Sequence, residues 1–438
     1  MKSGQARAAW PLAGAVNNGC LRTHARARVA AAALLLLSCS PVAGSAPAAT
    51  SAAVQFADNA ALAVSLTDLA GALLRPSDAT NAVVSPVATA VALGLVQAGA
   101  SGLAEQEIEA LFGPRPQGGR ALRQGLPALL RQMQGEPGTA SPLALAARMW
   151  VDGQASVPKP YVQRLASRWQ ADAQRVSFAQ SEAARALINS WTAERTAGRI
   201  QDLLPAGSIS SATQMALTSA VHFRSPWEKP FDAAQTVARP FKTAAGASKV
   251  VPTMVDERAV RQTRVDGHLV MEIPFAPLGG QPGFALLVAV PDEGAAAPAR
   301  PALISGTQLA RWRSALAPIK CELSLPRFAV APVSGSLKSA LQGLGVKTVF
   351  TDRADLRPML GRGAHQMHLD DVHQAAGITV DEQGGEAVAA AAATVRSKSF
   401  ALPVPTCAVD RAFMFALVHQ NSGAPLFVGR VGDPSSAP

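Results

Sequence analysis

One stretch near the C-terminus limits what this 438-residue chain can fold into, because it carries almost no side-chain bulk. Residues 381–400 read DEQGGEAVAAAAATVRSKSF. The stretch begins with acids and glycines, continues through six alanines and one valine, and ends with two basic residues among serines. No proline interrupts residues 381–402, so every backbone N–H there can join a β-ladder. A flexible low-complexity linker is the alternative interpretation.

The N-terminus has the plan of a secretory leader. Arg22, Arg26 and Arg28 precede a short apolar run at residues 29–37, which is too short to span a bilayer. The next residues, Leu-Leu-Ser-Cys, resemble a bacterial lipobox, in which Cys39 would be lipidated. We therefore expect residues 1–39 to be a leader and the protein to be exported, either to a bacterial envelope (periplasm or surface) or by secretion. Its only membrane attachment would be the lipid.

The charge of the chain gives no reason to expect a nucleic-acid partner. The formal net charge is +10, but five of the basic residues and none of the acidic ones lie in the first 50 residues. The remaining balance is 35 basic against 30 acidic residues, or +5. Basic residues also do not alternate with aromatic ones, as single-strand binding would need.

The rest of the chain reads as one α+β domain. Residues 40–54, rich in Ala, Ser and Pro, predict a tether to a body at 55–438. Early segments have helical spacing: four leucines before Pro76, then a second helix that Ser85 would cap. Later segments have β character, as at 284–291 and at 413–431, where a turn at 421–423 would join two strands.

Two of the four cysteines, Cys321 and Cys407, lie in this body. Cys321 alternates with apolar residues, as expected on the buried face of a strand. We therefore expect a buried free thiol rather than a disulfide. Two cysteines do not make a metal site, so we expect no metal and no cofactor.

Six segments resemble the serpin family in their order along the chain. They are NAVVSPVATAVALGLVQAGASG, INSWTAERTAGRIQDLL, VHFRSPWEKPFDAAQT, LSLPRFAV, LGVKTVFTDRADL and PLFVGRVGDP, and together they cover nearly all of the body. With the lipobox-like leader, the chain resembles a bacterial member. The resemblance implies a serpin fold, with helices packed on three β-sheets, an exposed reactive-centre loop at about 382–405, and a monomeric protein.

The resemblance also gives the alanine-rich stretch a role. Its start would be a hinge that lets the cut loop enter the main sheet, made by Glu382, Gly384, Gly385, Glu386, Ala387, Ala389 and Ala391. If Glu386 stays in water, strand alternation turns residues 385, 387, 389, 391 and 393 inward, and each of these is Gly or Ala. Such a strand can enter between paired strands without displacing packed side chains.

Counting sixteen positions from Glu382 places the bond that the protease cuts at Lys398–Ser399, with Arg396–Ser397 as the second choice. A lysine at this position matches the acidic specificity pocket of trypsin-like serine proteases. The resemblance further assigns a sheet-opening region to Ser85, Asn189, Trp227 and His373. Ser219, Ser225 and Ala88 depart from the family pattern there, which predicts an altered latch.

Two other clusters could be either ordinary surface residues or binding sites. HQMHLDDVH contains His365, His368, Asp370, Asp371 and His373, but strand alternation splits the histidines between two faces, so we expect no metal site. Arg115, Arg120, Arg123 and Arg131 form a basic run without acids. A solvated helix face is the default for this run, and weak polyanion binding is the alternative.

The sequence therefore predicts a suicide inhibitor of trypsin-like serine proteases. A serpin-fold binding or carrier protein that does not inhibit is the alternative, as is a plain protease substrate. An enzyme is not expected, because the chain has no Gly-x-Ser-x-Gly elbow and no His-Glu-x-x-His helix.

Overall fold

The computed structural model describes residues 48–75, 77–135, 141–293, 303–361, 367–385 and 404–436. The predicted leader lies outside these residues. Helix α1, Ala48–Leu74, begins inside the predicted tether, and the compact unit of the chain starts at Ala48 rather than at residue 55. Within the described residues, no helix has both the length and the apolar character that crossing a bilayer requires.

Helix α2, Pro86–Gln97, lies at the centre of the fold, and all of its residues are buried. It packs on both sheets, touching β4 (Met215–Phe223) and β16 (Pro425–Val431), which explains why it is apolar on every side. The Ser85 hydroxyl accepts a hydrogen bond from the Ala88 amide at 3.2 Å, which confirms the predicted N-cap. The other α-helices are α3 Gly102–Ala110, α4 Gln117–Arg120, α5 Leu126–Gln134, α6 Lys159–Trp169, α7 Ser181–Arg195, α8 Gly306–Ala315, α9 Lys338–Gly343 and α10 Arg357–Leu360.

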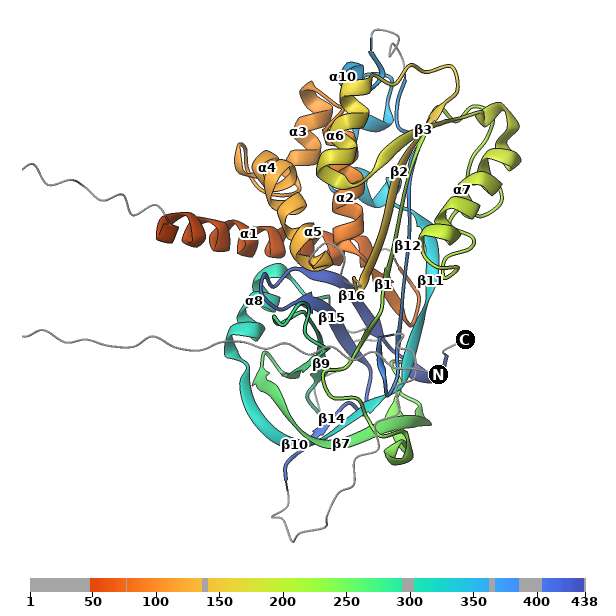
Figure 1. The fold of residues 1–438 in the computed structure, drawn as a ribbon. Helices are drawn as coiled ribbons and strands as arrows, with labels where there is room; N and C mark the ends of the chain where they lie inside the picture. The colour runs from red at the N-terminus through yellow and green to blue at the C-terminus, as the bar shows by residue number, and fades with distance from the viewer. Residues whose placement is uncertain are drawn as a thin grey trace, which may run out of the picture. The chain divides into compact units, whose positions relative to one another are not determined.

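The first sheet has seven strands among the described residues, and Figure 1 shows it beside α6 and α2, between them and α7. Its order is β3-β2-β4-β12-β13-β5, and β11 pairs with β12 as well. The strands besides β4 are β2 Leu143–Asp152, β3 Asp172–Val176, β5 Ser225–Pro226, β11 Phe328–Ser336, β12 Asp371–Val380 and β13 Gly384–Gly385. Helix α7 lies on the opposite side of this sheet from α2 (Figure 1).

The second sheet has nine strands, in the order β1-β16-β15-β9-β8-β7-β10-β14, and β6 pairs with β7. Its strands besides β16 are β1 Ala82–Val84, β6 Val237–Lys242, β7 Ser248–Val265, β8 His268–Pro274, β9 Phe284–Pro291, β10 Ala317–Pro326, β14 Thr406–Ala408 and β15 Phe413–His419. The long strand β7 pairs with β6 near its start and with β8 near its end. It therefore joins two of the three expected sheets into this one nine-stranded sheet. Strands β9, β15 and β16 confirm the β segments predicted from the sequence.

Candidate functional site

The predicted hinge begins inside the seven-stranded sheet. Gly385 pairs with Val380 of β12 on one side and with Ser225 of β5 on the other, and Gly384 pairs with Pro226. Both glycines are buried. Gly384 has φ +148°, and a Cβ atom there would lie 2.2 Å from the Ser225 carbonyl oxygen, so only glycine fits. Gly384 and Gly385, the fourth and fifth residues of the 381–400 stretch, thus already form a short strand between β12 and β5.

Nearer the start of β12, before the residue that pairs with β13, β12 is paired with β4 instead. They run parallel through six residue pairs, from Ala216 opposite Asp371 to Val221 opposite Ala376. Strand β13 runs antiparallel to β12, so the chain direction after Gly385 points toward this paired seam. A strand that continued from β13 would therefore have to separate β4 from β12.

The turn before β13 is anchored by Trp227, one of the residues predicted for sheet opening. The Trp227 indole Nε1 donates to the carbonyl oxygen of Asp381 at 2.8 Å, and its backbone N–H donates to that of Gln383 at 2.8 Å. The indole is 1% exposed and stacks on Phe275, with ring centroids 4.3 Å apart. These contacts fix where the hinge leaves the body.

Glu382, itself buried, adds an ion pair with the exposed Arg327 to the same turn. Its Oε1 accepts a hydrogen bond from Arg327 Nε at 2.6 Å and another from the Thr236 hydroxyl. Burial acts to raise the pKa of Glu382, but the hydrogen bonds from Arg327 and Thr236 outweigh burial and place the pKa below its usual value. The carboxylate is therefore charged at neutral pH and ties the hinge to Arg327, the residue between β10 and β11.

The latch between β12 and α2 is made by Gln374 and not by His373. Gln374 Nε2 donates to the Ser85 carbonyl oxygen at 2.9 Å and to the Thr89 hydroxyl at 2.8 Å, while its Oε1 accepts from the Ser85 amide at 3.2 Å. His373 is the preceding strand residue, so its side chain points to the opposite face, and the prediction that it serves the latch is wrong. Its Nε2 has no hydrogen-bond partner among the described residues, and burial lowers the pKa of His373.

Strand β12 pairs regularly from His373 to Ala376, and the irregularity in its pairing with β11 lies farther along the strand. The pairing of β11 with β12 shifts register between Val330 and Val333, and a Cβ atom on Gly377 would lie 2.8 Å from the Pro332 ring. Ala331 and Pro332 of β11 lie there opposite the single residue Gly377, so the extra residue of this bulge is in β11. Ser219, which lies beside Gln374 on β4, keeps a buried hydroxyl without a partner in the described structure.

Asn189 does not reach this latch either. It lies on α7, where its amide bonds the carbonyl oxygen and the N–H of Leu204 at 3.0 and 2.8 Å. It therefore fixes the chain that follows α7. The α7 face of the seam is instead formed by one row of small residues across three strands, Ala146, Ala220 and Ala375, packed against Trp191, Ile200 and Leu203.

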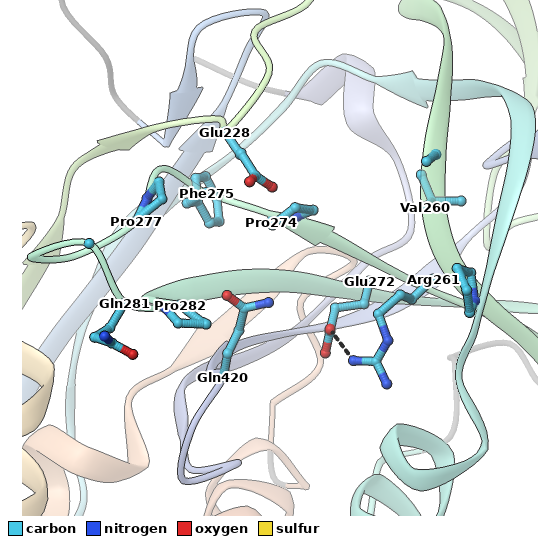
Figure 2. Close-up of a pocket in the computed structure, with 13 residues that line it drawn as sticks. Glu228, Val260, Arg261, Glu272, Pro274, Phe275, Pro277, Gln281, Pro282 and Gln420 are labelled. Atoms are coloured by element: carbon cyan, nitrogen blue, oxygen red, sulfur yellow. Dashed lines mark hydrogen bonds and ion pairs between the residues drawn. The ribbon is translucent and has the colours of Figure 1, made fainter.

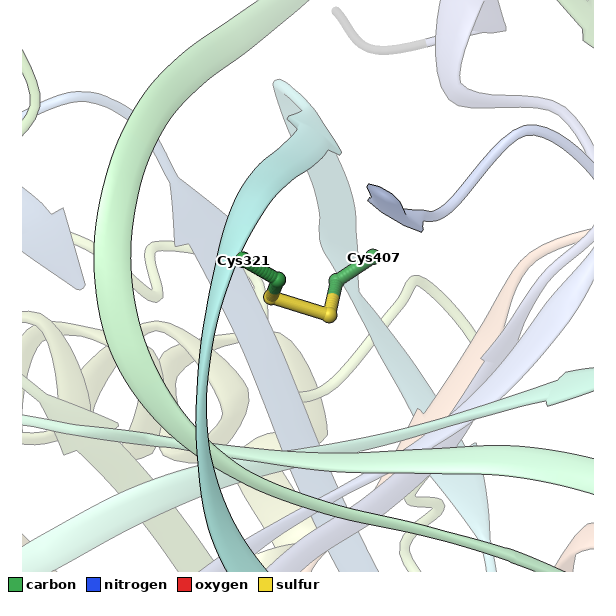
Figure 3. Close-up of a disulfide and its surroundings, with 2 residues drawn as sticks. All are labelled: Cys321 and Cys407. Carbon is green, nitrogen blue, oxygen red and sulfur yellow. A yellow bond between two sulfur atoms is a disulfide. The ribbon is translucent and has the colours of Figure 1, made fainter. Parts of the chain in front are cut away.

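Cys321 and Cys407 form a disulfide, so the expectation of a free thiol is wrong (Figure 3). The bond joins β10 to β14, the first strand after the predicted loop, with the two Cα atoms 5.9 Å apart. Strand alternation correctly placed Cys321 on a buried face. Its partner lies 86 residues away, and a pairing at that distance cannot be read from local spacing.

The two remaining clusters are bound up in local contacts. The Asp370 carboxylate accepts hydrogen bonds from the N–H groups of Gln214 and Met215 at 2.7 and 3.0 Å. In the part of the chain that the structure describes, no three or more His, Cys, Asp or Glu side chains come together in a way that could hold a metal ion. The basic run is free of acids only along the sequence, because α3 supplies Glu109, which pairs with Arg115 and Arg123.

A hollow of about 450 Å³ lies beside the hinge (Figure 2). Phe275, which stacks on Trp227, lines it together with several prolines, and Arg261 pairs with the buried Glu272 at 2.8 Å at one end. No residue predicted for the site lines this hollow.

Several predicted site residues lie outside the described residues and stay predictions. They are Cys39, Glu386, Ala387, Ala389, Ala391, Arg396, Ser397, Lys398 and Ser399, and His365 of the histidine cluster.

The comparisons with known proteins agree with this architecture. Residues 59–434 match the family described as Serpin (serine protease inhibitor). Putative serpin-Z12 of Oryza sativa subsp. japonica is 30% identical over 370 residues, covering 81% of this chain and 85% of that protein. Serpin B6 of Macaca fascicularis is 29% identical, covering 82% and 95%. A solved structure of thyroxine-binding globulin in complex with thyroxine superposes with a TM-score of 0.74 over 86% of this chain and 99% of that one, at 20% identity, and so shares the fold. The chain, whose helices pack on a seven-stranded and a nine-stranded sheet, belongs to the serpin family.

Proposed function

We propose that this serpin is a suicide inhibitor of trypsin-like serine proteases, and that residues from about 382 to 405 present the bond that is cut. The observation that carries the proposal is β13. The hinge already occupies the top of the seven-stranded sheet between β12 and β5, and it points at the seam that a longer strand would open.

The orientation of Gly385 supports the prediction of which loop residues would face the core after insertion. A Cβ atom on Gly385 would lie 3.0 Å from the Phe223 ring and 3.6 Å from the Phe275 ring, so position 385 faces the core. Residues two, four and six positions later share that face in a strand, and they are Ala387, Ala389 and Ala391. Glu386 would then face away from the core.

The proposed chemistry takes place on the protease. Its active serine attacks the carbonyl carbon of Lys398, the bond to Ser399 breaks, and Ser399 leaves with a free α-amino group. An ester then joins Lys398 to the protease. Water would normally hydrolyse this ester, so trapping requires that the freed segment insert and distort the attached protease first.

The free energy for this movement comes from new strand pairing. About a dozen ladder hydrogen bonds, at roughly 0.5–1.5 kcal/mol each, would release on the order of 10 kcal/mol. Opening the seam breaks six residue pairs, but the inserted strand would gain partners on both of its sides. The uncut fold is then held kinetically above a lower state.

We also propose that the protein is exported from a bacterial cell, with Cys39 as its lipid anchor, and works as a monomer. The disulfide supports export, because disulfides persist in oxidising compartments and are rare in reducing cytosol. Weak polyanion binding by the basic run stays a prediction. It would depend mainly on Arg120 and Arg131, because Arg115 and Arg123 are paired with acids of α3.

A denaturing gel after mixing with trypsin tests the inhibitor directly. We expect an adduct that survives SDS, and Lys398→Ala should lower its yield much more than Arg396→Ala. Gly385→Arg should give cut protein without adduct, because a large charged side chain would face the core. The matched control is Gly343→Arg, at a position where a Cβ atom meets nothing within 4 Å. Clean cleavage without adduct by the unaltered protein would instead support a carrier or a plain substrate.

A further inference from the structure

The disulfide holds the strand that receives the far end of the predicted loop. Cys407 lies in β14, the first described strand after residues 386–403, and Cys321 lies in β10. Strand β10 is firmly held, because it pairs with β7 along all ten of its residues. The two sulfur-bearing residues are 0% and 3% exposed. The loop therefore has a covalent anchor at its C-terminal end.

Without this bond, β14 would be weakly attached. It has three residues, lies at the edge of the nine-stranded sheet and pairs only with β10 among the described strands. The flanking bonds are Glu322 N–H to the Pro405 carbonyl at 3.0 Å and Val409 N–H to the Ser324 carbonyl at 2.9 Å. A handful of edge hydrogen bonds, each contributing about 0.5–1.5 kcal/mol, can open spontaneously.

Chain length shows why that attachment matters for a loop that has not been cut. Twenty residues, 386–405, connect Gly385 of β13 to Thr406 of β14. The register of Gly385 opposite Val380 would bring residue 394 opposite Asp371, the last pair of the seam. Each residue that enters shortens the remaining connection by one and moves its starting point about 3.4 Å farther along the sheet.

At full depth, twelve peptide steps remain, from residue 394 to 406, which span about 40 Å when fully extended. The return along the sheet alone takes about 30 Å, since nine residues have entered. The connection must also cross from the middle of one sheet to the edge of another. It would have to be almost straight. Release of β14 from β10 would add four residues, 406–409, and so would supply slack, while Asp410 and Ala412 stay hydrogen-bonded to Lys242 of β6.

We propose that the Cys321–Cys407 disulfide makes insertion of the hinge segment conditional on cutting, by preventing β14 from leaving β10 in the uncut protein. The inference rests on the proposed inhibitory function and adds its control. With the disulfide closed, an uncut molecule keeps its loop available to a protease. With the disulfide open, the uncut molecule drifts into the inserted, inactive form.

The test uses the full chain in three forms: oxidised, carrying Cys321→Ala/Cys407→Ala, and reduced with dithiothreitol. Dithiothreitol becomes a cyclic disulfide while both protein sulfurs become thiols, so each protein molecule takes up two electrons and two protons. Each form is incubated warm without protease, and samples are taken over time. A gel checks that the chain is uncut, a melting curve measures heat resistance, and mixing with trypsin measures the remaining inhibition.

We expect the two forms without the disulfide to gain heat resistance and to lose inhibition while uncut, at least about tenfold faster than the oxidised form. A parallel sample of each form is cut in the loop, and cutting should raise heat resistance with or without the disulfide, which shows that the variant is folded and can insert. If cutting raises heat resistance but all uncut forms stay equally active, the disulfide does not control insertion and the inference is overturned. If cutting raises it in none of them, the proposed function fails and the inference fails with it.

Discussion

Gln374 is the side chain that joins β12, one strand of the seam, to the start of the buried helix α2. It satisfies the buried N–H and carbonyl oxygen of Ser85 as well as the Thr89 hydroxyl, all at the start of α2. Removing a partner from buried polar groups usually has a larger effect than the net strength of the bond, because the groups stay buried without a partner. The latch therefore stabilises the closed seam out of proportion to its size.

The first prediction follows from these contacts. Gln374→Ala should lower the free energy of unfolding by about 1–3 kcal/mol, measured by urea titration, because the buried N–H of Ser85 loses its partner. Gln281→Ala is the control, since Gln281 is exposed. Equal stability of the two variants would show that Gln374 is not a latch.

The second prediction concerns acid. The pKa of Glu382 in the fold lies below its usual value, so its contribution is complete above about pH 4.5 and is lost as the pH falls through the lowered pKa. Melting temperatures between pH 3 and pH 7 should therefore decline more steeply for the unaltered protein than for Glu382→Gln. Parallel curves for the two proteins would mean that the pairing with Arg327 does not stabilise the hinge.

At the scale of elements, the two faces of the seam between β4 and β12 suit the opening that we propose. Its α7 face carries the alanine row of Ala146, Ala220 and Ala375, which leaves room for strands to shift beneath Trp191. Its α2 face is closed by one polar latch. The segment proposed to insert also has small residues on one side. Ala387, Ala389 and Ala391 would share the Gly385 face in a strand.

The third prediction tests the face on which each loop residue enters. Ala389→Arg should abolish the SDS-stable adduct and leave cleavage intact, because residue 389 shares the core-facing side of Gly385. Ala390→Arg introduces the same side chain one position later, on the opposite face, and should keep most of the adduct. Equal loss or equal retention in the two variants would argue against entry as a strand in this register.

Much of this level could be predicted from the sequence, because local patterns decide it. The cap at Ser85, strand β9 and the paired strands β15 and β16 follow from spacing and turn residues. The latch could not be predicted, since the spacing along the chain does not show whether residue 373 or 374 of β12 faces α2. The disulfide was missed because β10 and β14 become neighbours only in the folded sheet.

For the whole molecule, the central feature is the position of β13 in the seven-stranded sheet. Strand β13 lies between β12 and β5, and its direction leads to the seam where β4 and β12 are paired with each other. The disulfide fixes the far end of the connection. We infer that the native protein is a kinetically held state whose conversion waits for a cut.

Heat resistance before and after a single cut in the loop tests this claim most directly. Fourth among the predictions, cutting after Lys398 or Arg396 should raise the melting temperature by at least about 10 °C, as expected from on the order of 10 kcal/mol of new pairing. Calorimetry on the purified protein, with a gel to confirm one cut, is the measurement. Superimposable melting curves for the cut and uncut chains would contradict the central claim.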